Sequence, residues 1–87
     1  MIPTRASTTA WRVIEGEAVI LAVDTKVMRG LNAVGSRVWE LIDGRRSVDE
    51  IVETVVTEFA VEPARARADV EAFLRQLADK GLLTLAP

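Results

Sequence analysis

The strongest constraint on the fold is that strand-like and helix-like segments occupy separate parts of the chain. Strand signals gather between residues 11 and 31, whereas helical periodicity fills residues 33–80. A run of strands followed by a run of helices is typical of an α+β domain. The chain has 87 residues, which is the length of one domain. We therefore predict a single α+β domain.

Three short runs predict an antiparallel meander. Trp11–Ile14 is aromatic and β-branched, and a Glu-Gly turn follows it. Ala18–Val23 is apolar on both faces, which is typical of a central strand. Val27–Leu31 is interrupted by an arginine and a glycine, which suits an edge strand. A meander of this size needs helices packed on it to be stable.

Each of the three predicted helices has a recognisable start. Asn32 is a good N-cap for a helix over residues 33–43. Ser47 and Glu50 have the spacing of a capping box, and Pro63 suits the first turn of the third helix. The prediction is a winged helix-turn-helix-like arrangement, a three-stranded antiparallel β-meander followed by three α-helices.

The first ten residues, MIPTRASTTA, carry no strand or helix signal. We predict a flexible tail over residues 1–10 and a folded domain over residues 11–85. The tail lacks the apolar stretch of a secretory signal. No segment approaches the roughly 18–20 apolar residues that cross a bilayer. These features predict a cytoplasmic protein that does not bind a membrane.

The chain contains no cysteine and no histidine. This composition excludes disulfides, thiolate metal sites and a Ser-His dyad. Ser36 is interpreted as a helix-surface residue and Ser47 as a cap. No loop offers the dense oxygen cluster that a metal site of Asp and Glu alone needs. We predict a protein that binds a partner and does not catalyse a reaction, with no cofactor and no metal.

The charge pattern bears on nucleic-acid binding. The net charge is −2, whereas phosphate contacts favour a basic excess. The third helix presents Arg65, Arg67 and Arg75, but acidic residues are interleaved with them. The pattern favours a solvated charged face over a winged-helix DNA reader.

The edge strand over residues 27–31 suggests another use. An edge with free backbone N–H and C=O groups can accept a strand from a peptide, with side-chain pockets that give specificity. The same edge can instead be covered by the third helix or by a second copy of the chain. Periodicity alone leaves these alternatives open.

A series of short motifs in this order resembles the PqqD-like family. The matching segments are LN at 31–32, VWELIDG at 38–44, SVDEI at 47–51, Phe59, DV at 69–70, FL at 73–74, Leu77 and GLL at 81–83. The resemblance covers roughly residues 11–83. Trp39 stands where many members of the quinone pathway have a smaller aliphatic residue, which places the chain in the wider family.

The resemblance implies a precursor-peptide recognition element. Such domains bind the leader of a ribosomally made peptide and present it to a modifying enzyme, for pyrroloquinoline quinone or another peptide product. The implied partners are the leader peptide and an enzyme such as a radical SAM protein or a leader peptidase. No nucleic acid is expected, and a homodimer is the competing use of the edge strand.

In the family, the leader adds along the third strand and lies against the third helix. On this chain the implied backbone contacts come from Val27, Met28, Arg29, Gly30 and Leu31. The implied helix contacts come from Arg67, Val70, Glu71, Leu74, Arg75 and Ala78. Arg67 and Arg75 are the residues expected to pair with acidic leader residues.

Overall fold

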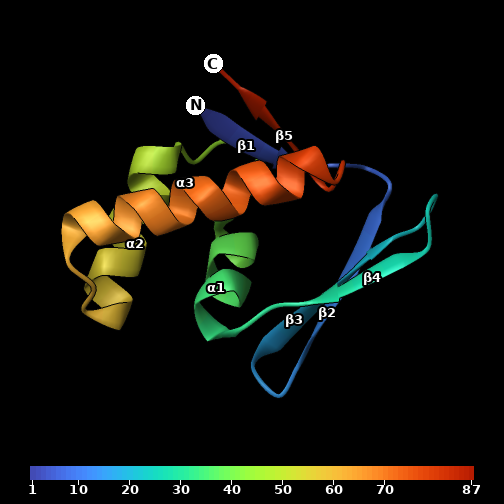
Figure 1. The fold of residues 1–87 in the computed structure, drawn as a ribbon, viewed down its shortest axis with the longest axis horizontal. Coiled ribbons are helices and arrows are strands. Elements are labelled where there is room, and N and C mark those ends of the chain that lie inside the picture. Colours follow the sequence, from blue (N-terminus) through green and yellow to red (C-terminus); the bar gives the residue numbers. More distant parts are fainter.

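The fold is a small α+β arrangement of three helices and two separate antiparallel sheets. The computed structural model describes the whole chain, residues 1–87. The elements in order are β1 (Ile2–Arg5), β2 (Thr9–Ile14), β3 (Glu17–Ala22), β4 (Val27–Gly30), α1 (Ala33–Leu41), α2 (Val48–Phe59), α3 (Pro63–Asp79) and β5 (Leu83–Ala86). Strands β2, β3 and β4 form one antiparallel sheet in that order, and β1 pairs with β5 in a second. Figure 1 shows both termini together on the β1–β5 pair, away from the larger sheet.

The meander forms where the sequence predicts it. Glu15 and Gly16 have φ angles of 54° and 81°, the positive values that a tight two-residue hairpin turn requires. Strand β3 is central, and its Ala18, Ile20 and Ala22 side chains are buried. Helix α1 packs against β3, and the small alanines allow the helix to approach closely. The opposite face of the sheet is only partly covered.

The N-terminal segment differs from the expected flexible tail. Residues 2–5 form β1, which pairs with β5 from the other end of the chain. Pro3 is fully buried. The Arg5 guanidinium donates to the carbonyl of Trp39 at 2.8 Å and lies 4.5 Å from the centre of the Trp11 ring. These contacts join residues far apart in the sequence, so local composition does not reveal them.

The helix starts agree with the sequence prediction. The Asn32 side chain accepts from the Gly35 N–H at 2.8 Å, and Ser47 with Glu50 forms the capping box. Ser36, however, does not lie on the helix surface. It is 2% exposed, and its hydroxyl accepts from the Ala18 N–H at 2.7 Å. This bond ties α1 to β3 just beyond the end of β4.

The core lies between the three helices and the buried face of β3. Its largest member is Trp39, which is fully buried. The helical spacing places Trp39 only beside the apolar stripe of α1, so its burial does not follow from the spacing alone. The Trp11 ring meets the Trp39 ring edge-on, with ring centres 6.3 Å apart. No helix of this structure is long and apolar enough to cross a membrane.

Candidate functional site

Strand β4 is an edge strand whose outer side is open. It pairs with β3 alone. The Leu31 N–H donates to the Ala18 carbonyl at 2.9 Å, and hydrogen-bonded residues alternate along an antiparallel ladder. Arg29 therefore turns its N–H toward β3, whereas Met28 and Gly30 turn theirs toward the free edge. These two residues offer the backbone groups that an added strand needs.

The side chains of β4 alternate between the two faces of the sheet. Arg29 lies opposite the buried Ile20, so its side chain is on the face that carries the helices. Met28 lies opposite Leu21 on the other face and is 69% exposed. Val27 is 53% exposed, although it lies on the helix-bearing face. The helix-bearing side of the open edge is thus formed by Val27 and Arg29.

One flank of α3 faces β4 across a gap. The Arg29 guanidinium reaches the side-chain oxygen of Gln76 at 3.5 Å, so two long side chains are needed to span the distance. Asp69, Phe73 and Gln76 follow each other at steps of four and three residues and therefore share this flank. We use the name β4–α3 groove for the region between β4 and this flank of α3, which the contact from Arg29 to Gln76 spans.

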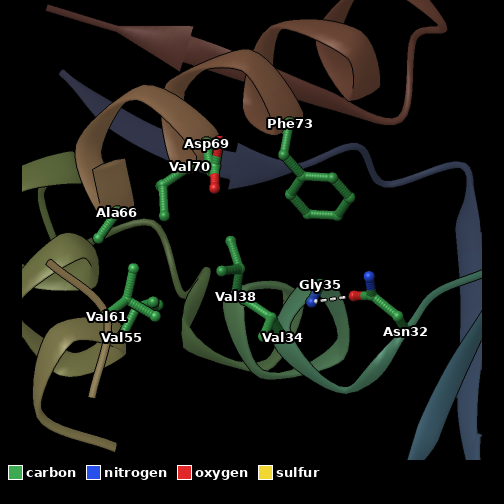
Figure 2. Close-up of a pocket in the computed structure, with 10 residues that line it drawn as sticks. All are labelled: Asn32, Val34, Gly35, Val38, Val55, Val61, Ala66, Asp69, Val70 and Phe73. Carbon is green, nitrogen blue, oxygen red and sulfur yellow. Dashed lines mark hydrogen bonds between the residues drawn. The ribbon is translucent and has the colours of Figure 1, made fainter. Parts of the chain in front are cut away.

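A hollow opens beside the groove at the start of α1. Its volume is about 320 Å³ and its lining is mostly apolar. The residues around it are Asn32, Val34, Gly35, Val38, Val55, Val61, Ala66, Asp69, Val70 and Phe73. Figure 2 shows the Phe73 ring reaching from α3 toward the first turn of α1, with Asn32 and Gly35 at the same end. Asn32 follows the last residue of β4 by two positions, so this end of the hollow lies close in sequence to the end of the strand.

The structure does not bring most of the helix residues implied by the family to this groove. Arg67 pairs with Asp49 of α2 at 2.8 Å and lies 3.8 Å from Glu71. Arg67 and Glu71 therefore lie on the flank of α3 that faces α2. Ala78 shares this flank by helical spacing and packs against the core. These three residues are away from β4.

The other three implied helix residues have different surroundings. Val70 and Leu74 are 2% and 1% exposed and belong to the core, although Val70 also lines the hollow. Arg75 is exposed on the side of α3 opposite the core. Asp69, Phe73 and Gln76, which are not among the implied contacts, lie on the flank of α3 toward β4. The sequence signal at this flank is Phe73, a bulky aromatic residue in the apolar stripe; the structure leaves it only half-buried.

The implied strand residues occupy the expected place with one exception. Val27, Met28, Arg29 and Gly30 form β4. Leu31 is buried and its N–H is already used in the ladder with β3. It offers no donor to an incoming strand.

The groups with shifted pKa values lie outside the groove. A hydrogen bond from Arg37 lowers the pKa of Glu58, and the same bond raises the pKa of Arg37. The pKa of Asp43 is lowered chiefly because it accepts from the Arg46 backbone N–H. Burial lowers the pKa of Arg5. These shifts belong to contacts that hold the fold together.

Comparison with known proteins identifies the family. The family model described as "Coenzyme PQQ synthesis protein D (PqqD)" matches residues 17–83. The chain belongs to the PqqD family. This PqqD-family chain is 36% identical over 76 residues to a PqqA binding protein of Rhodopseudomonas palustris strain HaA2, and 34% identical to that of strain BisB5. The match covers 87% of this chain and 66% of each relative, slightly less than two thirds of their length.

Three solved structures resemble this PqqD-family chain. TbiB1 in complex with the TbiA(beta) leader peptide has a TM-score of 0.89 and 33% identity, covering 97% of this chain and 98% of TbiB1. The PqqD truncation of Methylobacterium extorquens PqqCD, described as a stand-alone recognition element for ribosomally made peptides, has a TM-score of 0.79 and 27% identity, over 97% and 89% of the two chains. Lasso peptide synthetase B1 with its leader peptide has a TM-score of 0.87, over 98% and 100% of the two chains. At 15% identity, it supports the fold alone.

Proposed function

We propose that this protein is a non-catalytic adaptor that captures the leader of a ribosomally made precursor peptide. The leader adds as a strand to β4 and lies in the β4–α3 groove. The observation that carries the proposal is the open edge of β4, with the backbone groups of Met28 and Gly30 turned outward beside α3. The relatives support it, because two are PqqA binding proteins and TbiB1 was solved with a leader peptide.

In this proposal, affinity and specificity come from two different parts of the site. Backbone hydrogen bonds along β4 hold any extended peptide. Side chains of the peptide alternate between the faces of the sheet, so every second one enters the groove. The hollow beside Phe73 accepts an apolar side chain, because most of its lining is aliphatic or aromatic. Specificity thus depends on which residues occupy alternate positions.

The benefit of such binding is effective concentration. A peptide held by its leader presents its remaining segment to a modifying enzyme bound nearby, which raises the local substrate concentration without a new chemical contact. The partner in this proposal is an enzyme of precursor-peptide maturation, such as a radical SAM protein or a leader peptidase. In this proposal the peptide-binding domain consists of residues 11–85 together with β1. It acts in the cytoplasm.

The winged-helix DNA-binding alternative has no comparable support. Such a reader would present α3 to phosphates. Arg65 already pairs with Asp69, and Arg67 pairs with Asp49 and Glu71. Of the three arginines of α3, only Arg75 takes part in no ion pair. One unpaired arginine is little positive charge for a DNA reader, because phosphate contacts dominate nucleic-acid affinity.

The test is calorimetry with a synthetic peptide encoded by a short reading frame beside the gene of this protein. We expect one peptide per chain. Met28→Pro removes an outward N–H and should weaken binding about tenfold or more, since one lost backbone hydrogen bond and its distortion cost about 1–2 kcal/mol. A proline at Leu31 is unsuitable because that N–H supports the sheet itself.

Strand β2, the other edge of the sheet, provides a matched control. The Val23 N–H donates to the Thr8 carbonyl at 2.8 Å, so by the same alternation Trp11 and Val13 turn their N–H groups outward. Val13→Pro should leave peptide affinity unchanged. Equal affinity in both proline variants, with the fold intact by circular dichroism, would sink the proposal. Sedimentation at several concentrations separates peptide capture from a dimer that uses the same edge.

A further inference from the structure

The Arg29 side chain reaches from β4 to Gln76 of α3, and it lacks an acidic partner. None of the five ion pairs in the structure includes it. Its only side-chain hydrogen bond is the 3.5 Å contact with the neutral amide of Gln76. The side chain is half-buried and extends from β4 toward α3. A guanidinium in this position is incompletely satisfied.

Four other arginines, unlike Arg29, have a close carboxylate partner or two backbone carbonyl partners. Arg37, Arg46 and Arg67 each lie within 3 Å of a carboxylate, and Arg5 donates to two backbone carbonyls. Arg29 is thus a half-buried cation at the open edge of the sheet, held by a single long hydrogen bond.

An added strand changes the surroundings of Arg29. The backbone N–H and C=O of Arg29 face β3 and are not available to an added strand. If the peptide adds antiparallel to β4, the peptide residue opposite Arg29 therefore forms a non-hydrogen-bonded pair with it. Side chains approach most closely in such pairs. Directly opposite residues have Cβ atoms about 4.5–5.5 Å apart. The peptide also displaces bulk water from the guanidinium, which makes an unpaired charge more costly.

We infer that the captured peptide carries an aspartate or glutamate that faces Arg29. The carboxylate can accept two N–H bonds from the planar guanidinium, the geometry that favours arginine over lysine. Displacing the Gln76 contact costs little, because that contact is long. The inference rests on the proposed function and adds the chemical class of one leader residue. It moves the acid-recognising role from Arg67 and Arg75 to Arg29.

The test selects binders from a phage-displayed library of random 16-residue peptides on the wild-type chain, on Arg29→Glu and on Arg75→Glu. Peptides enriched on the wild type should share an acidic residue at a constant spacing from an apolar residue. On Arg29→Glu the same position should become Lys or Arg. Arg75→Glu makes the same change of charge outside the groove and should select the wild-type pattern. Circular dichroism confirms that each variant is folded.

One enriched peptide then gives the magnitude. Reversing its acidic residue to lysine should weaken binding to the wild type about five- to tenfold, and Arg29→Glu should restore it. Enriched peptides without an acidic position, or an unchanged pattern on Arg29→Glu, would overturn the inference while leaving strand capture intact. If the wild type enriches no peptide more strongly than the Met28→Pro variant does, strand capture and the inference are both overturned.

Discussion

The two flanks of α3 differ in how fully their polar groups are satisfied. On the flank facing α2, Arg67 is paired with Asp49 and lies near Glu71. On the flank facing β4, Gln76 meets Arg29 through one long contact, and Phe73 is only half-buried beside a hollow. Both flanks carry an ion pair, since Asp69 meets Arg65 on the side toward β4, but only that side has an arginine without an acidic partner and a half-buried aromatic ring beside a hollow.

This difference indicates which side of α3 can contribute to peptide binding in such a small domain. A buried stripe fixes the orientation of a helix, but both of its margins carry polar and apolar residues. Only the margin that faces an open strand edge can combine backbone and side-chain contacts with a peptide. The comparison predicts that changes on the flank facing α2 and in the core affect stability, whereas changes on the flank facing β4 affect binding.

The largest expected effect separates the core from the groove. Leu74→Ala should lower the free energy of unfolding by about 2–5 kcal/mol, because it creates a cavity at a fully buried site. Urea unfolding measures this loss. Gln76→Ala on the exposed groove flank should change stability by less than about 0.5 kcal/mol. A Leu74→Ala variant of normal stability that fails to bind peptide would place Leu74 in the groove after all.

The next effect separates the two flanks directly. Phe73→Ala should weaken peptide binding about tenfold, since aromatic residues in pockets dominate binding energy. Arg67→Ala should change affinity less than about twofold and stability by about 1 kcal/mol at most, as is usual for exposed ion pairs. Calorimetry and thermal unfolding of both variants check these values. Loss of peptide binding in Arg67→Ala and not in Phe73→Ala would contradict the assignment of binding to the flank that faces β4.

The smallest effect concerns pH and the ion pair between α1 and α2. Arg37 lowers the pKa of Glu58 from its ordinary value of 4.5. A carboxylate whose pKa is lowered in the folded state stabilises the fold at pH values where it is ionised. This contribution is lost as the pH falls through the folded-state pKa. Glu58→Gln should therefore have a slightly lower Tm than the wild type near pH 7. The difference should shrink as pH falls below 4.5; a constant difference would contradict this origin.

Local signals predicted most of the fold. The caps at Asn32 and Ser47 and the Glu15-Gly16 turn depend on neighbouring residues, so they could be read directly. Strand β1 could not, because it is stabilised by pairing with β5 and by the placement of Arg5 against two tryptophans. The burial of Ser36 likewise depends on a contact with another element, the hydrogen bond from Ala18.

The strand residues implied by the family form an open edge, whereas the implied helix residues are spread over the core, the α2-facing flank and the exposed side of α3. The interruption of residues 27–31 by Arg29 and Gly30 indicates an edge strand in the sequence. The spacing of Ala66, Val70 and Leu74 identifies the buried stripe of α3 but not which margin faces β4. That choice depends on how α1 and α2 position α3 over the sheet. Asp69, Phe73 and Gln76 could therefore be assigned to the groove only from the structure.

The most direct test of strand capture is amide hydrogen exchange, measured by nuclear magnetic resonance with and without the peptide encoded beside the gene. Bound peptide should slow exchange at Met28 and Gly30, whose N–H groups face the free edge of β4. Trp11 and Val13, on the free edge of β2, should exchange at the same rate in both samples. Protection at Trp11 and Val13 with none at Met28 and Gly30 would contradict capture along β4.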